Sequence, residues 1–162
     1  MRGRRRATML AGLLVLTGCA VLAPAPEAPT YRDPAAVLAG STRFDADRMA
    51  GRWVARACIG PCAPAVTFAV SQTGAVTETA ADGTTRTYVP TGPGILRAPD
   101  GAETLVVMWV DEDFRTAALG SATGSHARIL DRAPEGGADR IEAARRMLDF
   151  NGWDTGQLRT MQ

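Results

Sequence analysis

Short segments rich in β-branched and aromatic residues, separated by turn residues at a spacing close to ten, run from residue 52 to residue 134. Such a pattern is typical of an antiparallel barrel or sandwich, in which short strands alternate with tight turns. The segments that we predict as strands are 52–58, 65–71, 75–79, 85–89, 94–98, 104–110, 114–120 and 126–131. Most of their connections carry the glycine, aspartate or proline of hairpin turns. Eight strands are the number that a small closed barrel needs.

The hydrophobic period changes near the end of the chain from that of a strand to that of a helix. Residues 138–150 place four apolar side chains on one helical face, and Asn151 and Gly152 follow as a stop signal. The tail at residues 157–162 can add an edge strand. We therefore predict an all-β fold, an eight-stranded antiparallel up-and-down barrel with one C-terminal helix packed outside it.

The first residues of the chain follow the order of a secretory signal, in which positive charge precedes an apolar run. The run is too short for a bilayer-spanning helix, which needs about 20 apolar residues. It ends in Leu16-Thr17-Gly18-Cys19, which resembles a bacterial lipobox. We predict a lipoprotein signal peptide over residues 1–18 and a lipid anchor on Cys19. The alternative is an ordinary signal peptide with a chance cysteine, and the export route, general or twin-arginine, stays open.

Residues 19–42 are rich in alanine and proline and show no apolar period, so we expect a flexible tether there. The folded domain is then expected over residues 43–162, the size of one ordinary domain. Lipid on Cys19 would hold this domain on a membrane. Ala20 stands where an aspartate retains some bacterial lipoproteins in the inner membrane. We therefore expect an outer-membrane anchor and a domain that faces the periplasm.

The charge of the exported part argues against nucleic-acid binding. Four of the 18 basic residues lie in the signal, which leaves 14 arginines against 17 acidic residues. A net charge of about −3 lacks the excess of positive charge that nucleic-acid-binding domains carry.

Two further cysteines, Cys58 and Cys62, flank a Gly-Pro turn. In an oxidising envelope compartment this arrangement predicts a local disulfide. Redox catalysis is the sharper alternative, but the spacing is one residue longer than Cys-x-x-Cys and no thioredoxin-like pattern surrounds it. The single histidine and these two cysteines do not make a four-ligand metal site, so we expect no metal and no cofactor.

Three segments resemble, in the right order, the motifs of the lipocalin family. Residues 44–53 (FDADRMAGRW) resemble the first motif, and residues 110–119 (VDEDFRTAAL) resemble the second. Residues 127–134 (ARILDRAP) resemble the third in the form seen in bacterial outer-membrane lipocalins, and residues 152–158 (GWDTGQL) are similar to that subfamily's segment after the helix. The resemblance, to a bacterial outer-membrane lipoprotein of the lipocalin family, covers about residues 44–162.

The resemblance implies structural roles for the motif residues. Trp53, which follows Gly51 in the first motif, would close the narrow end of the barrel. The guanidinium of Arg132 would stack on its ring, a contact worth about 0.5 to 2 kcal/mol. Asp111 and Asp113 lie in a turn between two predicted strands, which favours a structural role over paired-carboxylate catalysis.

Barrels of this kind receive an apolar ligand through the open mouth, so inward side chains are the candidate binding residues. Side chains alternate between the two faces of a strand, so counting from an inward Trp53 places two alanines of the first strand inward. The second strand contributes three apolar residues. On the sixth predicted strand, one of two neighbouring large residues must face inward. The candidates are Ala55, Ala57, Val66, Phe68, Val70, and Met108 or Trp109. Hairpin parity places the loops at residues 58–62 and 121–125 at the mouth.

Ser125 and His126 suggest a nucleophile with a base, but neighbours in a strand point to opposite faces and the sequence identifies no third group. We therefore expect no enzyme and an exposed rim position for His126. The expected function is the binding or carrying of a small hydrophobic ligand, a fatty acid or a lysophospholipid. A filled barrel whose surface binds an envelope protein is the alternative, and an enzyme on the same scaffold is a weaker one. Cavity volume separates the first two.

Overall fold

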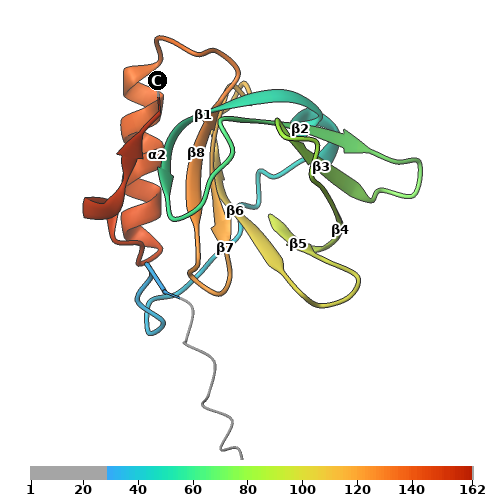
Figure 1. The fold of residues 1–162 in the computed structure, drawn as a ribbon, viewed down its shortest axis with the longest axis horizontal. Coiled ribbons are helices and arrows are strands. Elements are labelled where there is room, and N and C mark those ends of the chain that lie inside the picture. The colour runs from blue at the N-terminus through green and yellow to red at the C-terminus, as the bar shows by residue number, and fades with distance from the viewer. Residues whose placement is uncertain (1–28, 162) are drawn as a thin grey trace, which may run out of the picture.

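The computed structural model describes residues 29–161, in which antiparallel strands close into a barrel with one long helix outside (Figure 1). The elements are α1 (Ala46–Met49), β1 (Gly51–Ile59), β2 (Ala65–Val70), β3 (Val76–Ala80), β4 (Thr85–Gly92), β5 (Ile95–Arg97), β6 (Thr104–Val110), β7 (Thr116–Ser121), β8 (Ala127–Asp131), α2 (Ala138–Phe150), a 3₁₀ turn (Thr155–Gln157) and β9 (Arg159–Thr160). Strands β2 to β8 pair in chain order, and β1 pairs with both β8 and β2. The predicted fold class is confirmed.

Strand β1 closes the barrel with only part of its length. Its first half pairs with β2, from Gly51 opposite Phe68 to Val54 opposite Ala65. Beyond that point the free edge of β1 pairs with β9, where Ala57 lies opposite Thr160. The predicted edge strand in the tail is therefore present, and it covers the edge that β2 leaves open.

Two β-bulges reverse the expected alternation. One lies between Ala55 and Ala57 in β1, and the other lies between Val107 and Trp109 in β6. A bulge inserts an extra residue on one strand, so the side chains beyond it exchange faces. Ala57 accordingly packs outside the barrel. On β6, Met108 faces outward by alternation with the inward Val107, and the bulge turns Trp109 towards the same outer cluster. The prediction that Ala57, and Met108 or Trp109, face inward is wrong for this reason.

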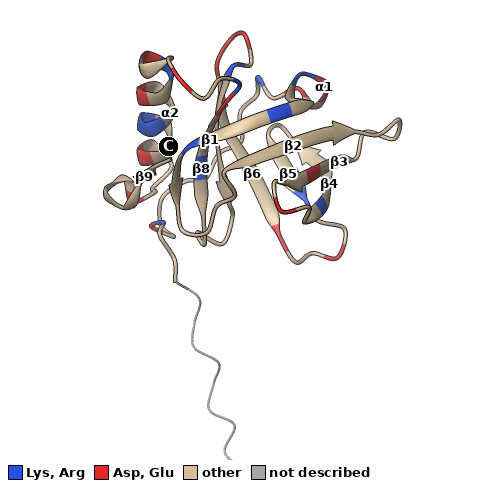
Figure 2. Ribbon diagram, turned by 45° about the horizontal axis from the view of Figure 1, so that its top comes forward, with Lys and Arg blue, Asp and Glu red and all other residues tan. Residues whose placement is uncertain are grey.

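Helix α2 covers the outer cluster over β6, β7 and β8 (Figure 1). Ala144 and Leu148 are fully buried on its inner face, while acidic and basic residues alternate along the helix (Figure 2). Gly120 of β7 admits the ring of Trp153, because a Cβ at Gly120 would lie 2.6 Å from Trp153 Cζ2. The amphipathic pattern of residues 138–150 is thus explained by packing against the barrel wall.

Residues 30–42, which the composition assigned to the tether, run along the barrel and hydrogen-bond to it. The backbone N–H of Tyr31 donates to Gly124 O at 2.8 Å, and that of Ser41 donates to Val107 O at 2.8 Å. Arg32 forms an isolated bridge with Trp153. The folded part of the chain therefore includes these residues.

The signal peptide, Cys19 and residues 19–28 of the predicted tether lie outside the described residues. Among residues 29–161, no helix combines the length and the apolar character that crossing a membrane requires.

Candidate functional site

One end of the barrel is closed by the indole of Trp53, which is fully buried. The guanidinium carbon of Arg132 lies 3.8 Å from the centroid of the Trp53 ring, and the indole N–H donates to Met49 O at 2.8 Å. The stack that the family resemblance implied is therefore present. We call this end the floor.

Arg132 also ties three segments of the floor together. Its guanidinium donates to Arg48 O at 2.8 Å, to Arg52 O at 3.1 Å and to Phe114 O at 3.3 Å. Partial burial lowers its pKa. Gly51 has a φ of 99°, which disfavours other residues there. The floor is thus a structural unit built around one arginine and one tryptophan.

The acidic turn between β6 and β7 is structural as well. The carboxylate of Asp111 accepts hydrogen bonds from the backbone N–H groups of Arg115 and Thr116, both at 2.6 Å. Asp113 is exposed and pairs with the Arg115 side chain at 2.9 Å. Both carboxylates are therefore occupied in holding the turn, as the sequence indicated.

Inward-facing apolar side chains fill the barrel above the floor. Of the predicted binding residues, Ala55, Val66 and Phe68 belong to this inner cluster, and Val70 packs against it partly buried. The members that are at most 2% exposed include Val66, Phe68, Val76, Tyr88, Leu96, Leu105, Val107, Leu119 and Leu130. Almost none of their surface is exposed, so the apolar interior is packed in this state.

A buried ion pair crosses the interior near the other end. Arg128 of β8 donates two hydrogen bonds to the carboxylate of Glu78 on β3, Nη1 to Oε1 at 2.8 Å and Nη2 to Oε2 at 2.6 Å. Their side chains are only 6% and 11% exposed. The third guanidinium nitrogen, Arg128 Nε, is buried and has no hydrogen-bond partner among residues 29–161.

A second carboxylate, Glu103, gathers three polar side chains beside this pair. Arg86 Nη1 lies 2.6 Å from Glu103 Oε2, and the Tyr88 hydroxyl donates to the same oxygen at 3.2 Å. His126 Nε2 lies 3.5 Å from Glu103 Oε1. We call the whole group the mouth cluster; its members are Glu78, Arg86, Tyr88, Glu103, His126 and Arg128.

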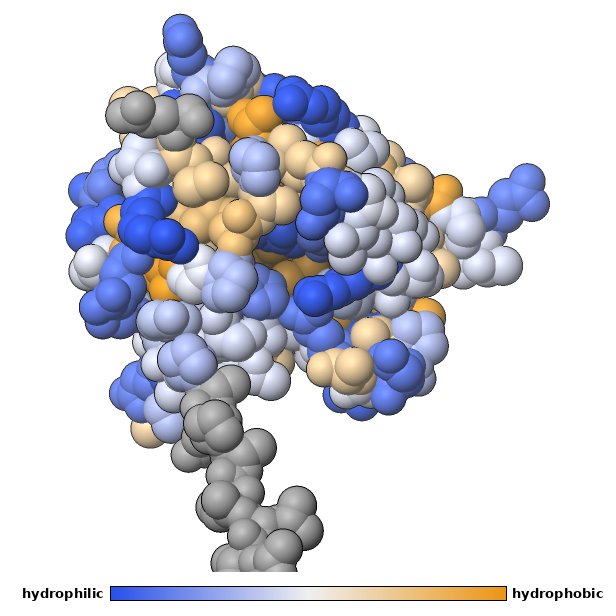
Figure 3. All heavy atoms as spheres, in the orientation of Figure 1, coloured by the Kyte–Doolittle hydropathy of each residue, from blue (hydrophilic) through white to orange (hydrophobic). Residues whose placement is uncertain are grey.

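The mouth cluster lies at the end of the barrel opposite the floor. The β1–β2 and β7–β8 loops lie at this end, as we predicted, because alternate hairpins of an up-and-down barrel share one end. Acidic and basic residues lie on the neighbouring strands β3 and β4 (Figure 2). Figure 3 shows a hollow near the centre of the molecule, with hydrophobic atoms at its bottom and hydrophilic residues around it. A group of charged side chains at one end of an apolar barrel is compatible with a binding mouth.

Burial shifts the pKa values of two cluster members. Desolvation raises the pKa of the Tyr88 hydroxyl, and the carboxylate of Glu103 raises it further. Desolvation lowers the pKa of His126, an effect that Glu103 opposes and Arg128 reinforces. The Glu103 carboxylate raises the pKa of Arg86. Around neutral pH the cluster therefore holds two arginines, two glutamates, a neutral tyrosine and a neutral histidine.

His126 is not the exposed rim residue that we expected, since its side chain is 17% exposed and touches Glu103. Its Nδ1 lies 3.2 Å from the hydroxyl of Ser125, so the two side chains do meet, and Glu103 is the third group that the sequence did not identify. However, the contact to Glu103 is longer than a good hydrogen bond, and the Ser125 hydroxyl also accepts from Thr123. The geometry favours a polar network over an activated nucleophile.

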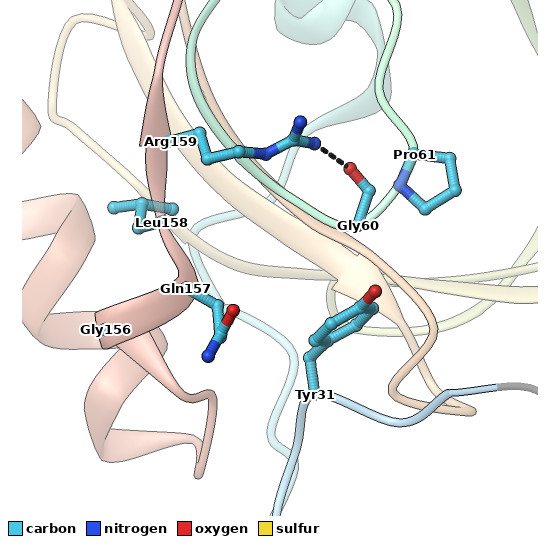
Figure 4. A pocket seen from close by; sticks show the side chains of 7 residues that line it. All are labelled: Tyr31, Gly60, Pro61, Gly156, Gln157, Leu158 and Arg159. Carbon is cyan, nitrogen blue, oxygen red and sulfur yellow. Dashed lines mark hydrogen bonds between the residues drawn. The ribbon is translucent and has the colours of Figure 1, made fainter.

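The predicted disulfide joins Cys58, at the end of β1, to Cys62 in the β1–β2 loop. Arg159 of β9 donates to Gly60 O in the same loop at 2.7 Å (Figure 4). A pocket of about 510 Å³ lies between this loop, Tyr31 and Leu158, outside the barrel. A second pocket, of about 570 Å³, adjoins it and also contains Tyr31.

Sequence reasoning missed the charged members of the mouth cluster. The signal was available in strand parity, because Glu78 alternates with the buried Val76, and Arg128 alternates with the buried Leu130. A charged residue on the inner face of a predicted strand therefore indicates a polar interior.

Comparison with known proteins does not assign the chain. No family model matches it, and no curated protein shows significant similarity to it.

Proposed function

We propose that this protein is a lipocalin-like binding protein for a small amphipathic lipid, such as a fatty acid or a lysophospholipid. In this proposal the lipid on Cys19 anchors it to the outer membrane, where the barrel faces the periplasm. The closed barrel with one sealed end supports it, because a ligand then has a single route of entry.

The buried ion pair between Glu78 and Arg128 carries the proposal. Taking two charges out of water is costly, and apolar side chains of similar volume in their place are often as stabilising or more so. Stability therefore does not account for a salt bridge inside a barrel that is otherwise packed with apolar side chains. A polar group above an apolar interior is what an amphipathic ligand requires.

The packed interior favours a second candidate, a filled barrel whose outer surface binds an envelope protein. Phe68 and Leu105, for example, are at most 2% exposed, so a lipid chain enters only if such side chains move. The two candidates differ in one observable, which is uptake of a lipid into the barrel.

A binding titration tests the proposal. The full chain carrying C19S is titrated with decanoate and with a lysophospholipid in competition with a fluorescent fatty-acid probe. We expect saturable binding that A55L weakens, because Ala55 points into the barrel, and that A69L leaves unchanged, because Ala69 is exposed outside. Thermal unfolding verifies that both variants fold. Binding no stronger than to the heat-denatured protein would favour the filled-barrel candidate.

The anchor is tested separately, by cell fractionation. We expect C19S to move the protein from the membrane fraction to the soluble envelope fraction, because the lipid provides the attachment. Serine at Cys62 is the matched control, since it removes a cysteine away from the predicted lipobox. Retention of C19S in the membrane fraction would contradict the anchor.

A further inference from the structure

Arg128 has unused capacity to bind an anion. A guanidinium carries five N–H donors in a planar fork that matches a carboxylate or a phosphate. In Arg128, Nη1 and Nη2 serve Glu78, whereas the buried Nε has no partner among the described residues. The side chain is 6% exposed, so water satisfies it poorly.

Arg86 is a second possible partner for the Glu78 carboxylate. In the register of β3 and β4, Glu78 lies directly opposite Arg86, whose side chain is 56% exposed. Residues directly opposite on neighbouring antiparallel strands are close enough for a charge pair. Rotation of the Glu78 side chain towards Arg86 would therefore exchange one arginine partner for another without leaving the carboxylate unpaired.

We infer that the barrel selects ligands with one acidic head group, and that this group replaces Glu78 on Arg128 while Glu78 turns to Arg86. This inference rests on the proposed function and adds the chemical class of the ligand. Glu78 acts as a built-in competitor that occupies the anion site of the empty barrel. A neutral amphiphile has no charge with which to displace it.

The apolar part of such a ligand has a defined neighbourhood. Phe68 faces inward on β2 and lies opposite Glu78 in the register. Tyr88 lies two residues after Arg86 on β4 and therefore on the same face of that strand. An alkyl chain attached to an acid group on Arg128 would therefore meet the rings of Phe68 and Tyr88 on the inner face of β2 and β4.

The experiment compares three ligands with the same tail. Decanoate, decyl phosphate and decanol compete with a fluorescent fatty-acid probe on the full chain carrying C19S. We expect each acid to bind at least about tenfold more tightly than the alcohol, as one good charge pair provides. The order of the two acids identifies the head group as carboxylate or phosphate.

Variants test the exchange. E78Q removes the competitor, so we expect about tenfold tighter binding of the acids and no change for decanol. Because E78Q leaves a buried cation and could destabilise the fold, the double variant E78L/R128L removes both charges together. It should bind acid and alcohol equally. R97Q, on the exposed face of β5, is the charge control and should leave all affinities unchanged.

Equal affinities of the wild-type barrel for acid and alcohol, with tail binding intact, would overturn the inference and leave the proposed function standing. An unchanged acid preference in E78L/R128L would overturn it as well. Failure of all three ligands to compete would instead overturn the proposed function.

Discussion

At the residue scale, the side chain of Arg132 closes the floor of the barrel. It stacks on Trp53 and donates hydrogen bonds to backbone carbonyls of α1, β1 and the β6–β7 turn. Its partial burial makes these hydrogen bonds stronger than they would be at an exposed site.

We predict that R132A lowers the free energy of unfolding by about 2 kcal/mol, from the lost cation–π contact and hydrogen bonds to a charged group. R52A is the matched control, because Arg52 precedes Trp53 on β1 at the same end of the barrel but its side chain is exposed. Chemical denaturation measures both. A similar loss of stability in the two variants would show that the floor does not depend on Arg132.

His126 provides a pH dependence. Burial lowers its pKa in the folded state, so the unfolded chain takes up the proton first as the pH falls. The free energy of unfolding is therefore expected to decrease as the pH falls from about 7.5 through the ordinary histidine value of about 6.5.

H126Q should flatten this part of the profile, since glutamine stays neutral throughout. Denaturant titrations at several pH values between about 5.5 and 7.5 measure the slope. An equally steep decrease in H126Q would assign the pH dependence to other groups.

At this scale the sequence predicted Trp53, Arg132 and the disulfide, because each belongs to a local or recognisable motif. It did not predict the pair between Glu78 and Arg128, which are 50 residues apart in the chain. That contact depends on the registers of several strands, and a single sequence does not specify them.

At the scale of elements, the packing of α2 and the segment after it against β7 depends on a glycine, Gly120. A Cβ at Gly120 would lie 2.6 Å from Trp153 Cζ2 and 2.9 Å from His126 O. The ring cannot move away easily, because Trp153 is 2% exposed in the outer cluster. The carbonyl of His126 is held as well, because it accepts a hydrogen bond from Ser121 N at 2.9 Å.

We predict that G120A destabilises the fold by about 1 to 3 kcal/mol through overpacking. Gly92 is the matched control, since a Cβ there would meet only Ile95 Cδ1, at an ordinary 3.7 Å. Thermal unfolding compares G120A with G92A. Equal midpoints of thermal unfolding in the two variants would show that the barrel wall under α2 accommodates the extra methyl group.

Strand and helix positions could be predicted because turn residues separate clear periodic segments; β6 and α2 have the predicted bounds. Side-chain orientation could not be predicted beyond a bulge. One extra residue before Ala57 and another before Trp109 turned both side chains towards the outer cluster. No composition signal at these positions marks the insertion.

At the scale of the whole molecule, the number of predicted strands was enough to predict a closed barrel. It was not enough to predict whether the interior is filled or hollow. Whether inward side chains fill a barrel of this size or leave a cavity depends on their packing across strands. In this chain Phe68, Tyr88 and Leu105 fill it, and the ion pair between Glu78 and Arg128 occupies the mouth. Uptake of the proposed ligand would therefore require movement of side chains, and the acid group would supply the charge that favours this movement.

Native mass spectrometry of the full chain purified from cells tests the proposed ligand binding most directly, because it measures the mass of the barrel together with any bound molecule. We expect a co-purifying amphipathic acid at about one molecule per chain, which lipid extraction then identifies. An empty chain that also fails to take up added fatty acid or lysophospholipid would contradict it.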